Sequence, residues 1–279
     1  RLDYEVELGA VIRKEIRPGT TIPPEKVKEY IAGFVVINDV TNRIGILLNM
    51  GKTEFTAAKT APSFLPVGPY FVPIENFQIP NGAYMPNLKM QTTVATAANK
   101  PAEVRQNGIS GETNFFINIA GAINQMLEKA GQVNKGFDGK EQKLLENGVF
   151  EAGDLLLMGT IAGTALRLTV RQGTKLGFTG FMNPGPNDTK TFYPHYGKYL
   201  PEEEGGMAAP MFYIVAHEYC TNPLYLTEGQ TVSLSIEELG TQKHVIVADA
   251  TNPAAATEEK MQKEPAEIAK LCSVNTVKP

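Results

Sequence analysis

The chain begins with RLDYEVELGAVI, residues 1–12, in which apolar and other residues alternate. From Tyr4 to Ile12 every second side chain is apolar, and Glu5 and Glu7 stand between them. A period of two predicts a β-strand with one face in the core. Side chains two residues apart in a strand point the same way, so the two glutamates share a face, roughly 6.5–7 Å apart. The ordinary explanation for such a pair is a solvent-exposed face.

A second stretch changes the interpretation of that acidic face. IAGFVVIND, residues 31–39, is apolar on both faces and rich in β-branched residues, which predicts a buried strand that ends at Asp39. Carboxylates are rarely buried without a partner. If Asp39 and the two glutamates met at about 5 Å, each pair would repel by roughly 3 kcal/mol at an effective dielectric near 20. A divalent cation would offset this repulsion, and all-oxygen ligands favour Mg²⁺, Mn²⁺ or Ca²⁺ over Zn²⁺.

The rest of the chain predicts a mixed, mostly β fold with one substantial helix. The helix is expected over residues 112–131, where apolar residues recur at helical spacing. Hairpins are expected over 88–106 and 226–247, and a strand between two turns over 150–168. The C-terminal tail predicts one short helix near 257–271.

Composition limits the classes of function. The 279 residues carry a net charge of −4 at a pI of about 5.6, which argues against nucleic acid or an anionic membrane as a partner. The two cysteines, Cys220 and Cys272, cannot form a disulfide framework or a C-x-x-C metal site, so a reducing compartment is expected. The apolar runs are too short to span a bilayer and no signal peptide is visible, which together favour a cytoplasmic protein.

Five separated blocks of the sequence, taken in order, resemble the fumarylacetoacetate hydrolase family. The blocks are YEVELG, AGFVVINDVTNR, AKTAPSFLPVGPYFVP, AGDLLLMGTIAGTA and LTEGQTVSLSIEELG. They extend the resemblance over residues 1–171 and 224–247. It implies a catalytic domain over 1–250 with the mixed, rolled β-structure of the family's C-terminal domain, followed by a tail at 251–279. It also implies a homodimer.

The resemblance implies a metal site and two cationic catalytic residues. The family's E-x-E glutamates and the aspartate at the end of its N-D strand bind a divalent metal, and they correspond to Glu5, Glu7 and Asp39. Mg²⁺ is the expected ion, with Mn²⁺ or Ca²⁺ as alternatives. Arg43, four residues after the aspartate, and Lys59, at the start of the block with P-x-G-P, correspond to family residues that face the substrate.

A Gly-Thr turn supplies the last implied substrate contact. Gly159 and Thr160 match the family's turn that contacts a carboxylate or carbonyl of the substrate. In RQNGISGETNFF, residues 105–116, the family has a further Gly-x-Thr/Ser turn before its helix. Two registers fit that turn, so Thr113 is only a weak candidate.

The chemistry that these residues imply is enolate chemistry on a dicarbonyl. A 1,3-diketone or 2-oxo acid would chelate the cation, which would stabilise an enolate, while lysine and arginine add positive charge where negative charge develops. We therefore expect a metal-dependent hydrolase that cleaves a C–C bond in a 1,3-dicarbonyl or acylpyruvate-type 2-oxo acid. The alternatives are a decarboxylase, hydratase or keto–enol isomerase of the same family, or a non-catalytic metal-binding relative.

Several positions depart from the family pattern. Ile44 replaces an acid that many members carry, and Ile46 replaces the glutamine of the members that cleave fumarylacetoacetate, which weakens the case for that substrate. The family's catalytic histidine lies in a lid upstream of the E-x-E strand. Since Arg1 is not an initiator methionine, we expect that this lid segment, and any targeting signal, precedes the present sequence.

Residues 172–223 form a longer connection than most of the family has. The stretch is rich in phenylalanine and tyrosine, so it is expected to pack on another surface. A dimer contact is favoured, and a surface loop or a substitute lid are the alternatives. The three histidines, His195, His217 and His244, show no spacing typical of a zinc site or a catalytic triad.

Overall fold

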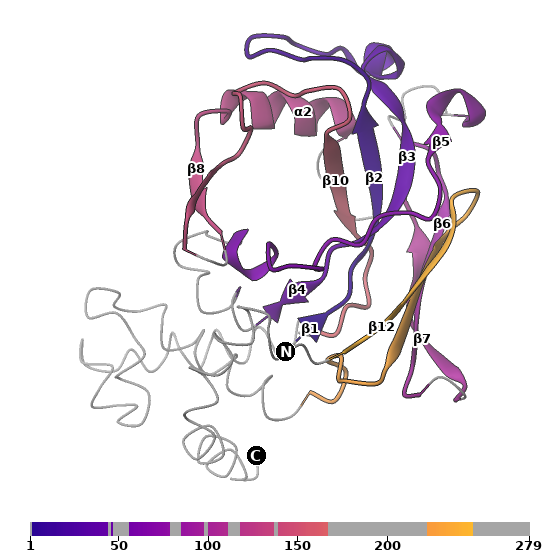
Figure 1. Ribbon diagram of the computed structural model, residues 1–279. Helices are drawn as coiled ribbons and strands as arrows, with labels where there is room; N and C mark the ends of the chain where they lie inside the picture. The colour runs from indigo at the N-terminus through magenta and orange to yellow at the C-terminus, as the bar shows by residue number, and fades with distance from the viewer. Residues whose placement is uncertain are drawn as a thin grey trace, which may run out of the picture.

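The computed structural model describes residues 2–43, 46, 56–78, 85–97, 100–110, 118–136, 139–166 and 222–247. Among these residues β-strands predominate, and one α-helix, α2, has defined bounds. The expected mixed, mostly β fold with one substantial helix is therefore confirmed. In Figure 1, strands β10, β2 and β3 run side by side, with β6, β7 and β12 along one flank.

The central sheet contains most of the predicted N-terminal strand. Its order is β10–β2–β3–β5, and all neighbouring strands are antiparallel. The four strands are β2 (Val6–Ile12), β3 (Ile31–Asn38), β5 (Val72–Pro73) and β10 (Leu155–Thr160). Val6 pairs with Asn38, so the start of β2 lies beside the end of β3. This register brings the E-x-E stretch next to Asp39.

The second sheet consists of the two predicted hairpins. Its order is β12–β11–β6–β7, again antiparallel throughout. The strands are β6 (Lys89–Ala95), β7 (Ala102–Ile109), β11 (Thr231–Ile236) and β12 (Gly240–Val245). The hairpins expected over 88–106 and 226–247 are confirmed, although they are distant in sequence and meet through the β6–β11 pairing.

The strand predicted over residues 1–12 is divided in two, because side chains replace the ladder at its start. The Tyr4 amide donates to Asp3 Oδ1 at 2.8 Å, and the Glu5 amide donates to Asn38 Oδ1 at 3.1 Å. Side-chain bonds to the backbone compete with strand pairing and leave no trace in hydrophobic alternation. Leu2 and Asp3 instead form β1, which pairs with β4.

The shorter elements connect these sheets. The short strands are β1 (Leu2–Asp3), β4 (Thr41–Asn42), β8 (Val133–Lys135) and β9 (Glu141–Lys143). The 3₁₀-helices are η1 (Pro24–Glu29), η3 (Thr56–Ala58) and η4 (Ile74–Asn76). The β8–β9 hairpin was not predicted, because its strands are short and mostly exposed and carry no alternation.

Helix α2 (Ile119–Glu128) lies within the predicted range of 112–131. Asn118 caps it, because its side-chain oxygen accepts the Gly121 amide at 2.8 Å and so satisfies a backbone donor of the first turn. Residues 111–117, which include Thr113, lie outside the described residues.

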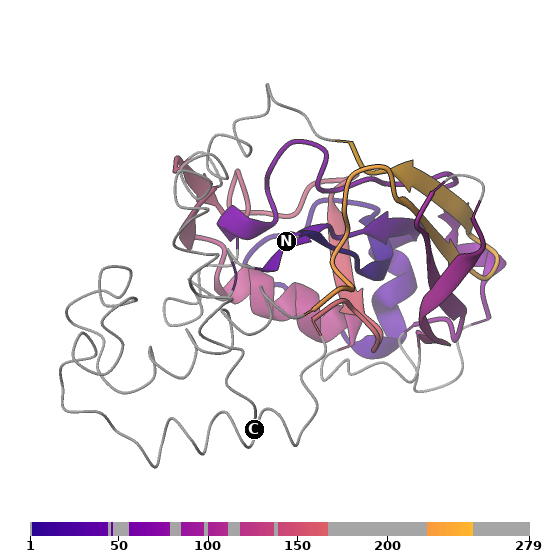
Figure 2. The same ribbon diagram turned by 90° about the horizontal axis from the view of Figure 1, so that it is seen from below.

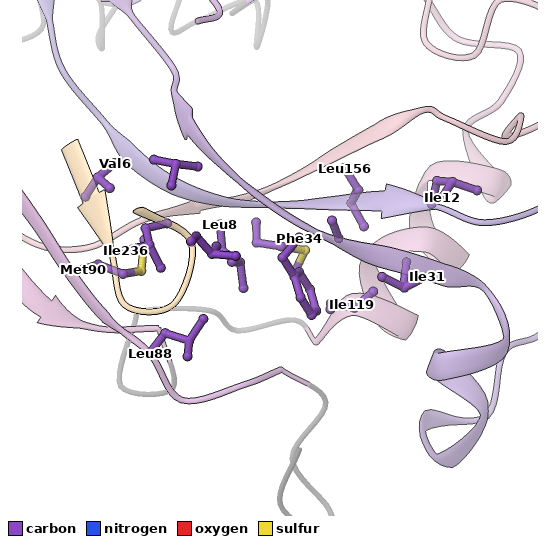
Figure 3. Close-up of a cluster of buried hydrophobic side chains, with 14 of the residues drawn as sticks. Val6, Leu8, Ile12, Ile31, Phe34, Leu88, Met90, Ile119, Leu156 and Ile236 are labelled. Atoms are coloured by element: carbon purple, nitrogen blue, oxygen red, sulfur yellow. The ribbon is translucent and has the colours of Figure 1, made fainter. Parts of the chain in front are cut away.

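The core lies against one face of the central sheet. Figure 3 shows Val6 and Leu8 near Met90 and Ile236 of the second sheet. The same figure shows Ile12, Ile31 and Phe34 at the other end of β2, near Ile119 of α2. All eight side chains are at most 1% exposed. The apolar side chains of the N-terminal strand therefore join the central sheet to the second sheet and to helix α2. The side chains between them, which include Glu5 and Glu7, remain available for a site.

Figure 1 shows helix α2 and strand β12 on opposite sides of strands β2 and β3, and in Figure 2 the helix and the orange-yellow hairpin again lie apart. Most of the stretch at 172–223 and the whole tail from 248 lie outside the described residues, as do His195 and His217. The expected division into a domain over 1–250 and a tail stays a prediction. No helix in the described part of the chain combines the length and apolarity that crossing a bilayer requires.

Candidate metal centre

Three carboxylates converge where β2 begins and β3 ends. Glu5 immediately precedes β2, Glu7 lies within it, and Asp39 follows the last residue of β3. One oxygen from each lies within 4.8 Å of the others, and all three residues are buried. Figure 1 places this corner near the labels of β1 and β4. The antiparallel pairing of the two strands thus gathers residues that are 34 positions apart in sequence.

Burial disfavours the ionised form of Glu7. Burial, with smaller contributions from the charges of Asp39 and Glu5, raises the pKa of Glu7 from 4.5 to about 8. The charge of Lys59 acts against this shift, as does a hydrogen bond in which the Gly159 amide donates to Glu7 Oε2 at 2.7 Å. Gly159 has a φ of 84°, which favours glycine, and its amide points at the carboxylate from the end of β10.

Lys59 joins two of the carboxylates. Its ammonium donates to Glu5 Oε2 at 2.9 Å, to Thr41 Oγ1 at 2.9 Å and to Asp39 Oδ2. Burial lowers the pKa of Lys59, but the charges of Glu5 and Asp39 outweigh it and the net shift is upward. Burial likewise raises the pKa of Asp39 to about 6, although Lys59 opposes that shift. About a quarter (26%) of the Lys59 side chain is exposed, so the ammonium has an approach from solvent.

Arg43 joins a second pair of acids, Asp3 and Glu5. Its Nε donates to Asp3 Oδ2 at 2.7 Å, and its Nη2 donates to Glu5 Oε1. Burial lowers the pKa of Arg43, but the charges of Glu5 and Asp3 more than reverse it. Only 10% of its side chain is exposed. The guanidinium is therefore a buried fork between two carboxylates.

The charges of this group fit a divalent cation. We define the carboxylate cluster as Asp3, Glu5, Glu7, Asp39, Arg43 and Lys59. With all groups ionised, four carboxylates and two cations leave a net charge of −2 in a buried place. The donor atoms of Glu5, Glu7 and Asp39 are all carboxylate oxygens, which suit Mg²⁺, Mn²⁺ or Ca²⁺. The residues therefore fit the ion that the sequence suggested.

A neutral network lies beside the cluster. Gln106 on β7 is fully buried, and its Oε1 accepts the Val6 amide at 3.1 Å and the Thr92 hydroxyl at 2.7 Å. Its Nε2 donates to Thr160 Oγ1 at 2.9 Å and to the Ile161 carbonyl at 2.8 Å. We call Gln106, Thr92 and Thr160 the glutamine network. It joins both sheets, and every hydrogen-bonding capacity of the amide is used.

The structure places Thr160 next to the site with its hydroxyl already engaged. The hydroxyl donates to the Val6 carbonyl at 2.9 Å and accepts from Gln106. Thr160 pairs with Glu7 across β10 and β2, so both lie at the same end of the sheet. The expectation that Thr160 and Gly159 contact a substrate stays a prediction, as does the corresponding expectation for Arg43 and Lys59.

Sequence reasoning missed two residues of this region. Asp3 continues the spacing of Glu5 and Glu7 by one more step, as D-x-E-x-E, and this regularity could have identified it. Gln106 has no comparable signal, because its partners come from three separate segments of the chain. His244, on β12, contacts Gln242 Oε1 at 2.5 Å through its Nε2 and belongs to neither group.

Comparison with known proteins agrees with these observations. The fumarylacetoacetate (FAA) hydrolase C-terminal family matches residues 1–247. Oxaloacetate tautomerase YisK of Bacillus subtilis is 28% identical over 183 residues, which cover 64% of this chain and 48% of that protein. An uncharacterised protein of Staphylococcus epidermidis is 27% identical over 185 residues, with 66% and 46% covered. The chain thus spans about half the length of the curated relatives it matches.

The solved structures show the same fold. A fumarylacetoacetate hydrolase from Exiguobacterium antarcticum aligns with a TM-score of 0.51 at 20% identity, over 89% of this chain and 57% of that one. A structure of Cg1458 with an inhibitor aligns with a TM-score of 0.51 at 15% identity, over 89% and 58%. The match over 1–247, which extends across both sheets and the carboxylate cluster, shows that this chain belongs to the fumarylacetoacetate hydrolase C-terminal family.

Proposed function

We propose that this chain is the metal-binding part of an enzyme that acts on a 1,3-dicarbonyl or an acylpyruvate-type 2-oxo acid, with hydrolytic C–C bond cleavage as its reaction. The observation that carries the proposal is the buried carboxylate cluster, in which three carboxylate oxygen donors converge and the formal net charge, with every group ionised, is −2. A solvent-exposed acidic face would need no such burial. A purely structural core would need no such excess of negative charge.

Each residue of the cluster has a proposed role. Glu5, Glu7 and Asp39 would hold a divalent cation, which, when bound, supplies a Lewis acid to two neighbouring carbonyl oxygens of a substrate. Lys59, the more exposed of the two cations, would add positive charge where negative charge develops on the substrate. Arg43 would act mainly on Glu5, since its recorded partners are Glu5 and Asp3.

A second reaction is supported by a specific relative. YisK is named as an oxaloacetate tautomerase and is 28% identical to this chain over 183 residues. Keto–enol isomerisation removes a proton from the carbon beside the carbonyl and returns it to the oxygen, with no bond to water. It needs the same cation and the same Lys59 charge as hydrolysis does. Isomerisation is therefore the second candidate. A homodimer and a cytoplasmic location stay part of the proposal.

Two substrates separate the two reactions. The complete protein, loaded with Mn²⁺, would be incubated with an acylpyruvate and, separately, with oxaloacetate. Hydrolysis consumes one water and releases pyruvate and a carboxylic acid from the acylpyruvate. Isomerisation changes the enol absorbance of oxaloacetate and releases no pyruvate. Metal-dependent release of pyruvate and the carboxylic acid from the acylpyruvate is the expected result.

The variant Lys59→Met tests whether the observed reaction takes place at the carboxylate cluster. Because the ammonium would act mainly as charge develops, kcat should fall by roughly 10²–10³ with a smaller change in KM. A change in KM alone would make Lys59 a substrate-binding residue only. The absence of metal-dependent turnover on both substrates would contradict the proposed function.

A further inference from the structure

We infer that Asp3, which is not among the three proposed metal ligands, is a positioning residue of the metal centre. It neutralises Arg43, holds that guanidinium on Glu5, and ties the backbone after β10 to the same corner. The inference rests on the proposed metal-dependent function. It adds a residue that acts on the cation only through a neighbour.

The hydrogen bonds of Asp3 carry the inference. Its carboxylate is fully buried and accepts four N–H groups, two on each oxygen. Oδ1 accepts the amides of Tyr4 at 2.8 Å and Ala165 at 2.6 Å. Oδ2 accepts the amide of Leu166 at 3.1 Å and the Nε of Arg43 at 2.7 Å. Both oxygens are thus committed to N–H donors, so Asp3 is poorly placed to be a fourth ligand.

Charge gives Asp3 an influence on the neighbouring cation site. Arg43 lies between two carboxylates, and its Nη2 donates to Glu5, which is one of the proposed ligands. Were Asp3 neutral, the positive charge of Arg43 would act on Glu5 without a local counter-charge. The Glu5 carboxylate would then offer less negative charge to a cation. In a buried place this charge is poorly screened, so a divalent cation should bind less tightly.

The backbone bonds give Asp3 a second connection to the site. Ala165 and Leu166 follow β10, and the same strand carries Gly159, whose amide donates to Glu7. Asn222 adds to this corner, because its Nδ2 donates to the Ala165 carbonyl at 2.7 Å. One segment therefore contacts Glu7 at one end and Asp3 at the other. Asp3 fixes the second end.

The competing explanation is that Asp3 only stabilises the fold. A buried carboxylate that binds three backbone amides would do so without any effect on a metal. The two explanations differ in one measurable respect. A purely structural role lowers stability whether or not Arg43 is present, whereas the positioning role affects metal affinity only when Arg43 is present. A double-mutant cycle on Mn²⁺ affinity measures that dependence.

The experiment is isothermal titration of the chelator-treated complete protein with Mn²⁺. The variants are Asp3→Asn, Arg43→Met and the double variant. Asp3→Asn is expected to lower Mn²⁺ affinity about tenfold in the wild-type background, because Arg43, no longer shared with Asp3, then offsets the charge of Glu5 more fully. In the Arg43→Met background the same change should alter affinity less than about twofold, since the charge that Asp3 neutralises is absent.

Ser110→Ala is the matched control for stability. Ser110 is as buried as Asp3, and its hydroxyl also accepts a backbone amide, that of Leu88 at 2.9 Å, but the residue lies outside the carboxylate cluster. Its substitution should lower Tm and leave Mn²⁺ affinity unchanged. If Asp3→Asn does not fold, Arg43→Lys gives the second test. Lysine keeps the charge but cannot bridge Asp3 and Glu5 as a fork, so affinity should fall at least about threefold.

Two outcomes would overturn the inference. One is unchanged Mn²⁺ affinity in Asp3→Asn or, where that variant is unfolded, in Arg43→Lys. Another is an equal loss from Asp3→Asn in both Arg43 backgrounds, which would make Asp3 independent of Arg43. Both leave the proposed metal site intact. A wild-type protein that binds no Mn²⁺ would instead contradict the proposed function itself.

Discussion

The carboxylate cluster and the glutamine network are two buried polar groups at the same end of β2, and they differ in how completely they are satisfied. Gln106 uses both lone pairs and both amide hydrogens in bonds to protein groups. The cluster holds four acids against two cations, and burial raises the pKa of Glu7 to about 8. A neutral network whose hydrogen bonds are all made joins the two sheets, whereas a charged cluster with excess negative charge can still bind a cation.

The difference has a physical basis in the cost of burying charge. A neutral amide needs only hydrogen bonds of good geometry, and three segments around Gln106 supply them. A group of carboxylates also needs counter-charge, which Arg43 and Lys59 supply only in part. We expect substitutions in the two groups to have different effects. Substitutions in the carboxylate cluster should alter metal affinity, and substitutions in the glutamine network should alter stability.

Replacing Glu7 should have the largest effect. Glu7→Gln keeps an oxygen for the Gly159 amide but removes a charged ligand. Because changing an outer-shell partner alone typically costs 10–100-fold in metal affinity, loss of the ligand charge should cost about 100-fold or more. Titration calorimetry with Mn²⁺ measures the loss. Glu75→Gln, the same change at an exposed ion pair with Arg13, is the matched control and should leave affinity unchanged.

The pH dependence of stability in the metal-free protein should be the next largest effect. Unfolded glutamate titrates near 4.5 and folded Glu7 near 8, so the folded state binds the extra proton between these values. Asp39, whose pKa burial raises to about 6, contributes in the same direction. Stability should therefore be highest at low pH within this window and fall as pH rises toward 8.

The size of that decline is on the order of a few kcal/mol, since one pKa unit corresponds to about 1.36 kcal/mol. Urea unfolding between pH 5 and 8.5, with a chelator present, measures it. Saturating Mn²⁺ should reduce the decline, and Glu7→Gln should remove most of it. A stability that rises with pH over this window would show that Glu7 is ionised at little cost, contrary to the proposed excess of negative charge.

Breaking the glutamine network should have a smaller effect of a different kind. Gln106→Met has a similar length but leaves the Val6 amide and the Thr92 hydroxyl without their acceptor. Each unsatisfied buried group costs about 1–3 kcal/mol, so unfolding in urea should show a loss of about 3 kcal/mol. Mn²⁺ affinity should stay within about threefold of the wild type. If Gln106→Met lowered Mn²⁺ affinity as much as Glu7→Gln does, the predicted difference between the two groups would be wrong.

The sequence predicted the cluster better than the network, for physical reasons. Alternation places Glu5 and Glu7 on one face from local spacing alone, and the apolar run of β3 predicts that Asp39 ends a buried strand. Their convergence depends on the β2–β3 register, for which only the family resemblance gave support. Gln106 contacts Val6, Thr92 and Thr160 across two sheets, and no local pattern encodes such contacts.

The fold shows the same division. Long hairpins and helix α2 were predictable, because hydrophobic periodicity and caps are local signals. The break between β1 and β2 was not, because it depends on the Asp3 and Asn38 side chains, which take the amides of Tyr4 and Glu5. Because of that break, Asp3 lies in β1 and is not one of the proposed metal ligands, whereas Glu5, just before β2, and Glu7, near its start, are.

Anomalous diffraction from crystals of this protein soaked in Mn²⁺ tests the central claim most directly. We expect one strong peak with carboxylate oxygens of Glu5, Glu7 and Asp39 at about 2.1–2.4 Å, between the ranges for Mg²⁺ and Ca²⁺. Lys59 should then have left its position between Glu5 and Asp39, while Arg43 stays on Asp3. A crystal with no peak at these carboxylates, and with the Lys59 ammonium still bonded to both, would contradict the account.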